Sequence, residues 1–270
     1  MFKKKEFIII GLTTFNTEFL RISVPKIAKL RAGAPVCLII NNDNPGRNVS
    51  RRQIRKFGYR GKLHIINSLS NQGPLQARLN ILAHAAAFGI KSEWMIFVDD
   101  DDLLIRLDIP KALPEHYAVM HNMVFIKQRL IDLLRVIDNS DNYEIDDTRI
   151  TAERPHIGIV GTLLRTKIMT QLCALVQPIV PEIHAIDASL NGRQPEDIVM
   201  WFYLQMYARS KDPNAAPLYS DSVNYIATML DTAPTKYGKS LIPTNMAQED
   251  YDNVMARYCQ VFEKVLINEK

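Results

Sequence analysis

The sequence predicts an α/β protein in which a mostly parallel central sheet is flanked by helices and followed by a C-terminal helical extension. Two observations lead to this prediction. Short apolar runs alternate with amphipathic stretches over residues 7–102, and polar clusters directly follow several of the runs. The composition, 47% hydrophobic and 23% charged, is ordinary for a globular protein. At 270 residues the chain can bury a large core, so it needs no disulfide framework.

Four apolar runs predict the first strands of the sheet. They are Phe7–Ile10, Val36–Ile40, Leu63–Ile66 and Trp94–Val98. Helices are expected between them at Thr17–Arg31, Ser50–Phe57 and Pro74–Phe88. Runs that are apolar throughout are typical of strands covered on both faces. Strand–helix alternation at this spacing predicts right-handed crossovers and a parallel sheet.

The pattern is less regular after residue 103. We expect a helix over Tyr117–Ile137, a polar loop over Asn139–Arg154, a strand over Ile157–Leu164, a helix over Pro195–Ala208 and an amphipathic helix over Tyr251–Leu266.

Polar clusters follow three of the predicted strands, at Thr13–Asn16, Asn41–Asn44 and Asp99–Asp102. Ligands of parallel sheets bind beyond the carboxyl ends of the strands, where these clusters should meet. Four adjacent carboxylates repel one another, and a divalent cation that prefers oxygen ligands would relieve that repulsion and bridge to phosphate. Asp99–Asp102 is therefore a candidate metal site, and a solvated acidic turn is the alternative.

The segment Asn71–Asn80 is predicted to be a loop that enters a helix. A helix N-terminus offers free N–H groups to an anion, and Arg78 lies one turn inside, within reach of a base or phosphate. An ordinary turn explains the same residues.

The order of these motifs resembles the GT-A fold glycosyltransferases, specifically the large inverting family 2. The first strand of that family ends in Pro-Thr-Tyr-Asn, which Thr13–Asn16 matches, and the second ends in an Asp-rich turn, which Asn41–Asp43 matches. The family's Asn-x-Gly-x-x-x-Ala-Arg-Asn segment is matched from Asn71 to Arg78, with Asn80 in place of the next Asn.

Three further segments extend the resemblance. The family's Asp-x-Asp-Asp strand end is matched by Asp99–Asp102, a Gly-rich strand by Gly158–Gly161, and a Glu-Asp pair that opens a helix by Glu196-Asp197. The ordered resemblance covers roughly residues 6 to 208. It implies a GT-A-like, Rossmann-related domain over residues 1–230, with a nucleotide-binding half (1–103) and an acceptor half (104–230), and a helical extension over 231–270.

The resemblance also implies roles for individual residues. It implies a nucleotide-sugar donor, which is expected to be a UDP-sugar. Seven residues are expected to contact its nucleotide: Thr14, Phe15, Asn41, Asp43, Arg78, Asp99 and Asp100. Asp101, with Asp99, would hold Mn²⁺ or Mg²⁺ on the diphosphate. Asp197, beside Glu196, would be the base that deprotonates the acceptor hydroxyl.

The sequence departs from the family pattern at several positions. Phe15 replaces a Tyr and Asn41 replaces an Asp, which alters the contacts to the base. Many GT-A enzymes add a late His to the metal, but every His of this chain lies at or before His184. A helix that opens with Pro195, Glu196 and Asp197 is also what an ordinary helix start looks like, because acids favour the positive end of the helix dipole.

The charge is unevenly distributed. No acid lies between Asp43 and Glu93, and nine of the chain's 33 Lys and Arg residues fall there, so the rest of the chain is net acidic. The segment Arg47–Lys62 carries most of this charge. A solvated basic helix explains it, and so does an anionic acceptor, either nucleic acid or a lipid-linked sugar at a membrane surface.

The three cysteines Cys37, Cys173 and Cys259 are widely separated, which favours a reducing compartment. No apolar run is long enough to span a bilayer. We therefore expect a cytoplasmic protein, with peripheral attachment to a membrane surface as a further expectation.

The leading interpretation is a metal-dependent inverting glycosyltransferase. A metal-dependent phosphohydrolase or nuclease would use the same acidic cluster on a phosphodiester. A non-catalytic relative that binds a nucleotide or nucleic acid is the third class.

Overall fold

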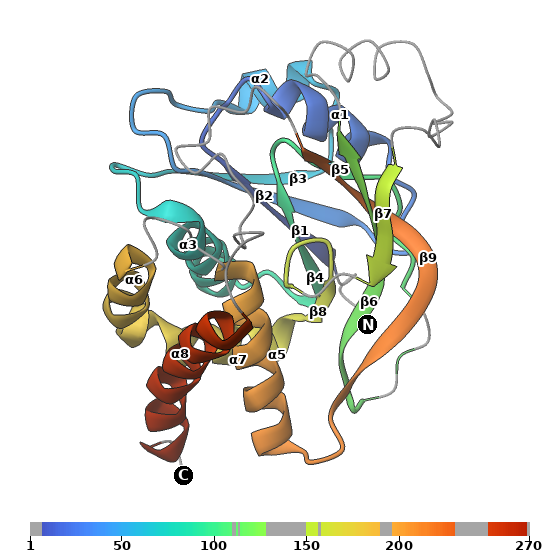
Figure 1. Ribbon diagram of the computed structural model, residues 1–270. Coiled ribbons are helices and arrows are strands. Elements are labelled where there is room, and N and C mark those ends of the chain that lie inside the picture. The colour runs from blue at the N-terminus through green and yellow to red at the C-terminus, as the bar shows by residue number, and fades with distance from the viewer. Residues whose placement is uncertain are drawn as a thin grey trace.

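The protein is described by a computed structural model (Figure 1), which covers residues 7–109, 112, 114–127, 150–155, 158–189, 196–229 and 248–268. The described strands form one mixed sheet in the order β3-β2-β1-β4-β8-β6-β9-β5, with β7 paired to β6. Its first strands are β1 (Phe7–Thr14), β2 (Val36–Asn42), β3 (Lys62–Asn67) and β4 (Ser92–Asp99), and their mutual pairings are parallel. The α/β class and the mostly parallel sheet predicted from the apolar runs are confirmed.

Helices cover both faces of this parallel part. They are α1 (Leu20–Lys29), α2 (Arg51–Lys56) and α3 (Gly73–Ala87). Side chains alternate between the faces of a strand. In β1, Ile8 and Ile10 pack in the same core as α1 and α2, whereas Ile9 packs in the core that contains α3. The two-sided burial explains why these strands are apolar throughout.

The second part of the sheet contains β5 (Leu103–Leu104), β6 (His116–Lys127), β7 (Ile150–Pro155), β8 (Leu163–Arg165) and β9 (Ala216–Met229). β8 pairs antiparallel with both β4 and β6, and β6 pairs parallel with β9. The β4–β8 ladder joins the two parts of the sheet.

The helix expected over Tyr117–Ile137 is wrong where the chain is described, because residues 116–127 form β6. The apolar stripe that indicated a helix came from Leu130 to Ile137, which lies outside the described residues. Residues 116–127 are themselves a continuous apolar-rich run, a pattern that does not separate strand from helix. The polar loop expected over Asn139–Arg154 is likewise wrong for residues 150–154, which belong to β7.

The remaining helices pack on the α3 face of the sheet. They are α5 (Thr166–Val176), α6 (Val180–Ser189), α7 (Glu196–Lys211) and α8 (Gln248–Asn268). The predicted C-terminal helix is present as α8, whose Tyr258 and Phe262 are fully buried. The Tyr203 ring of α7 stacks on Phe262, and its hydroxyl donates to the Tyr258 carbonyl at 2.9 Å. Within the described ranges no helix is long and apolar enough to cross a membrane.

Candidate active site at the carboxyl edge of the sheet

The polar clusters that follow β1, β2 and β4 come together at one edge of the sheet. Thr13 of β1 lies opposite Asn41 of β2 on one side and opposite Asp99 of β4 on the other. This arrangement follows from parallel pairing, because neighbouring strands then end at the same edge.

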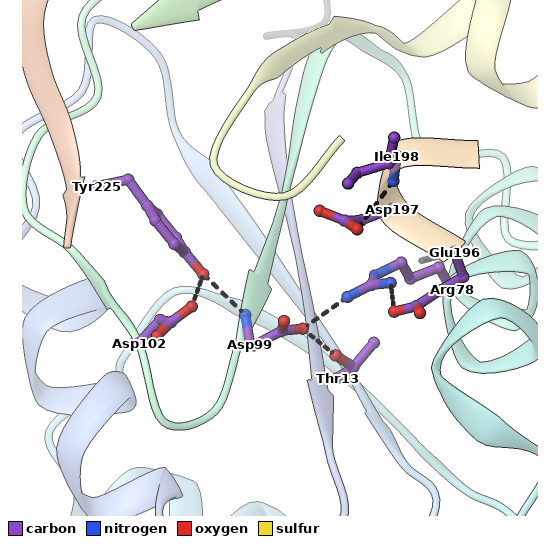
Figure 2. Close-up of polar contacts among 8 residues, drawn as sticks. All are labelled: Thr13, Arg78, Asp99, Asp102, Glu196, Asp197, Ile198 and Tyr225. Carbon is purple, nitrogen blue, oxygen red and sulfur yellow. Dashed lines mark hydrogen bonds and ion pairs between the residues drawn. The ribbon is translucent and has the colours of Figure 1, made fainter. Parts of the chain in front are cut away.

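The acidic turn Asp99–Asp102 is held by hydroxyl groups from both parts of the sheet (Figure 2). Thr13 Oγ1 donates to Asp99 Oδ1 at 2.8 Å, and the Thr14 hydroxyl donates to Asp100. The Tyr225 hydroxyl of β9 donates to Asp102 Oδ2 at 2.8 Å. Asp100 and Asp102 are buried, whereas Asp99 and Asp101 remain partly exposed.

Tyr225 of β9 fixes the turn from the second part of the sheet. Its hydroxyl also accepts the backbone N–H of Asp99 at 3.2 Å, and the side chain is completely buried. Gly161 packs against the ring so closely that a Cβ atom there would lie 2.8 Å from Tyr225 Cγ. The sequence carries no local signal for this role, since the residues that meet Tyr225 are distant along the chain.

Arg78 of α3 lies at the centre of the site with only 3% of its surface exposed. One terminal nitrogen donates to Asp99 Oδ1 at 2.9 Å and the other donates to Glu196 Oε1 at 2.8 Å. Burial alone would lower the pKa of Arg78, but these two carboxylates outweigh it and raise the pKa. Arg78 thus bridges β4 and α7. Its Nε has no hydrogen-bond partner among the described residues. The contact of Arg78 with the nucleotide stays a prediction.

Glu196 and Asp197 occupy the first turn of α7 and face different ways. Glu196 is paired with Arg78, whereas Asp197 points into the space above Asp99 (Figure 2). Asp197 Oδ1 accepts the Ile198 N–H at 2.8 Å. Burial raises the pKa of Glu196 to about 7 and that of Asp197 to about 6, and Arg78 opposes both shifts. The neighbouring Arg78 therefore favours the ionised form of Asp197.

The other nucleotide candidates lie at the ends of β1 and β2. Phe15 is 49% exposed, and Asn41 is fully buried with its Oδ1 lacking a hydrogen-bond partner in the described part of the chain. The Asp43 carboxylate accepts the N–H groups of Gln72 and Gly73, at 3.0 Å and 2.7 Å to Oδ2. Asp43 thus joins the end of β2 to the start of α3, a structural role that its place in the motif did not reveal.

A divalent cation at this turn would have two partly exposed carboxylates available, Asp99 and Asp101. Burial and the neighbouring Asp99 raise the pKa of Asp101 to about 7, as expected for crowded carboxylates whose repulsion a cation relieves. Within the described ranges, no three His, Cys, Asp or Glu side chains are grouped to hold a metal ion on their own. The residues fit a cation that completes its shell with diphosphate and water, rather than one enclosed by protein ligands alone.

No protein-family model and no curated protein matches this sequence. Among solved structures, S. aureus TarS is similar over 96% of this chain, with a TM-score of 0.47 and 15% sequence identity, and the chain spans 43% of its length. TarS residues 1–349 in complex with UDP-GlcNAc is similar over 96% of this chain and 71% of its own, with a TM-score of 0.43 and 16% identity. The mannosyltransferase PcManGT from Pyrobaculum calidifontis, in complex with GDP-Man and Mn²⁺, is similar over 98% of this chain and 73% of its own, with a TM-score of 0.43 and 10% identity.

Proposed function

We propose that this chain is a glycosyltransferase that moves a sugar from a nucleotide-sugar, in the first place a UDP-sugar, to an acceptor hydroxyl with inversion. One observation carries the proposal. A partly exposed acidic turn and the carboxylate of Asp197 face the same space, and the buried Arg78 links the elements that bear them.

Asp197 supplies the base of the reaction. Its carboxylate accepts the proton of the acceptor hydroxyl while the hydroxyl oxygen attacks the anomeric carbon from the face opposite the leaving group. The bond between that carbon and the diphosphate oxygen breaks, and its electron pair leaves with the nucleoside diphosphate. Attack opposite the leaving group inverts the configuration of the anomeric carbon.

The acidic turn is assigned to the donor. Asp99 and Asp101 would hold Mn²⁺ or Mg²⁺, and a bound cation would neutralise the charge that develops on the diphosphate. Phe15 and Asn41, at the ends of neighbouring strands, would contact the base. Asp99 would face the ribose, and Asp100 would also contact the nucleotide. Glu196 would act through Arg78, which holds the first turn of α7 in place.

Substitution of Asp197 tests the proposal. The protein is incubated with a panel of nucleotide-sugars and Mn²⁺, and release of nucleoside diphosphate is measured. Asp197→Asn should cut turnover at least about a hundredfold, the range of general-base catalysis, while calorimetry finds donor affinity nearly unchanged. Glu182→Gln, which removes an exposed acid from α6, is the matched control and should keep full turnover.

The same assay, repeated with a phosphodiester substrate, separates the alternatives. Normal turnover by Asp197→Asn would show that this residue is only part of a helix start. Cleavage of a phosphodiester substrate without sugar transfer would assign the acidic turn to a phosphohydrolase or nuclease. Nucleotide binding without turnover of any donor would indicate a non-catalytic protein.

A further inference from the structure

One edge of the molecule is strongly basic. Five exposed side chains of α2, the following turn and β3 form it, and we call them the basic edge: Arg51, Arg52, Lys56, Arg60 and Lys62. β3 is the end strand of the sheet order, so these residues border the outermost strand. No acid occurs between Asp43 and Glu93, so the chain around the basic edge offers no local counter-charge.

The fold itself uses only part of this charge. Arg55, which lies between the exposed residues, donates to the carbonyls of Tyr59 and Gly61 at 2.8 Å and 3.1 Å. Arg60 donates to the Arg55 carbonyl at 2.9 Å, and Arg47 pairs with Glu18 at 3.3 Å. Arg51, Arg52 and Lys56 are exposed, and no ion pair to them is found in the described part of the chain. Arg52 and Lys56 are four residues apart on this helix, so the two like charges repel each other.

The basic edge lies on the wrong face to contact the reacting groups. Ile54 of α2 packs in the core beneath α1, whereas α3 and α7, which carry Arg78 and Asp197, pack on the opposite face of the sheet. Figure 1 shows α1 and α2 together on one side of β1–β3, with α3 and α7 on the other. This placement therefore argues against a direct role of α2 in holding the acceptor against Asp197.

An exposed apolar side chain lies beside the basic residues. Asn67, the last residue of β3, accepts the Val49 N–H at 2.8 Å and donates to the Val49 carbonyl at 3.2 Å. These two hydrogen bonds place the loop that follows β3 next to the start of α2. Leu69 in that loop is 98% exposed, so a large exposed apolar group lies near the start of α2, where Arg51 and Arg52 are.

We propose that the basic edge and Leu69 together dock the protein onto an anionic lipid bilayer. Basic side chains are attracted to anionic headgroups, and an adjacent apolar side chain can insert at the headgroup boundary. Leu69 and the start of α2 both follow strand ends at the carboxyl edge of the sheet. The proposal does not depend on the transferase activity.

A nucleic acid is the less suitable partner for this surface. Proteins that hold single strands combine basic grooves with aromatic side chains on which bases stack. Of the two aromatics within the segment Arg47–Lys62, Tyr59 is 3% exposed, and its hydroxyl donates to backbone carbonyls of Val36 and Lys62. The other, Phe57, is partly buried against the core.

Vesicle binding tests the proposal. The probe is phosphatidylcholine vesicles with about 30% phosphatidylserine, with pure phosphatidylcholine as the neutral comparison, in about 50 mM salt. The protein should sediment with the anionic vesicles only, and added salt should release it. Each basic side chain near such a surface strengthens binding about fivefold. The triple variant Arg51→Gln, Arg52→Gln, Lys56→Gln should therefore bind roughly a hundredfold more weakly.

Two further variants locate the contact. Lys167→Gln, Arg257→Gln and Lys264→Gln together remove the same charge from exposed positions on α5 and α8, and this control should bind the vesicles as tightly as the native chain. Leu69→Ser should weaken vesicle binding severalfold without changing its dependence on salt. Because all these side chains are exposed, folding should be unaffected, which a thermal melt verifies.

Three outcomes would overturn the proposal. The first is no binding of the native chain to the anionic vesicles. The second is equal weakening by the control triple, which would show a general charge effect. The third would assign the surface to nucleic acid. In that case the native chain binds duplex DNA in a salt-sensitive way, the basic-edge triple variant loses this binding, and Leu69→Ser keeps it. Both variants would then bind the vesicles as the native chain does.

Discussion

Arg78 has a structural role that its sequence motif does not indicate. The motif implied a contact to the nucleotide base, but the side chain is buried between Asp99 and Glu196 and satisfies both. Arginine suits this position because its planar group donates in two directions at once, which a lysine ammonium does less well.

Removal of Arg78 should destabilise the protein strongly. Arg78→Met leaves the buried Glu196 and the partly exposed Asp99 without their cation. Loss of one partner from a buried ion pair typically costs about 3–5 kcal/mol, and the Glu196 pair is the one of this kind. The free energy of unfolding is measured in denaturant, with Arg52→Met on exposed α2 as the matched control. A loss no larger than that of the control would mean that the bridge contributes nothing to stability.

The metal prediction belongs to Asp101. Asp101→Asn should abolish the gain in nucleoside diphosphate affinity that Mn²⁺ provides. The fold should remain intact, because removing one of several crowded carboxylates lessens their repulsion. Calorimetry with and without Mn²⁺ measures the gain, and Asp108→Asn, an exposed acid beyond the turn, is the control. An unchanged Mn²⁺ effect in Asp101→Asn would remove this residue from the metal site.

Helices and strands can be predicted from the sequence where their burial produces a regular pattern of apolar residues. β1 to β4 are covered on both faces and therefore read as continuous apolar runs. β6 was mistaken for a helix because an apolar run of its length fits both structures, and its partner β9 lies far along the chain. Long-range pairing decides such a segment, and a single sequence does not display it.

β3 and α3 are joined by a histidine pair whose protonation should affect stability. His64 Nδ1 and His84 Nε2 are 2.9 Å apart, and the Phe88 ring stacks on His84 with centroids 4.2 Å apart. Burial lowers the pKa of both rings below the ordinary 6.5, and His84, Lys62 and Arg51 lower that of His64 further. As the pH falls, these two histidines are therefore protonated in the unfolded chain before they are protonated in the folded protein. The stability that the neutral pair contributes is present above about pH 6.5 and is lost as the pH falls below it.

The variant His84→Gln should lessen this dependence. Between about pH 8 and about pH 5.5 the native chain should lose more unfolding free energy than the variant does. Denaturant unfolding at both pH values measures the difference. His184→Gln on α6 is the matched control and should behave like the native chain. Parallel losses in the native chain and His84→Gln would contradict the prediction.

The whole molecule is assembled from two parts of a sheet, and the candidate site lies where they meet. The sequence could place Asp99–Asp102, Asn41 and Asp197, because strand ends and helix starts carry local patterns. It could not show that Arg78 meets Glu196 across 118 residues, or that Tyr225 meets Asp102 across 123 residues. Those contacts arise only when β9 and α7 pack against the first part.

Gly161 has a further consequence for how the protein tolerates mutation. Its backbone has a φ of +73°, and even a methyl group would collide with the Tyr225 ring, which in turn holds the acidic turn. A survey of every single substitution, scored by donor binding, should find this position as restricted as the acidic turn itself, although it contributes no polar side chain. Glycine has only a hydrogen atom where every other residue has a carbon. Variants with another residue at position 161 would therefore be removed by selection.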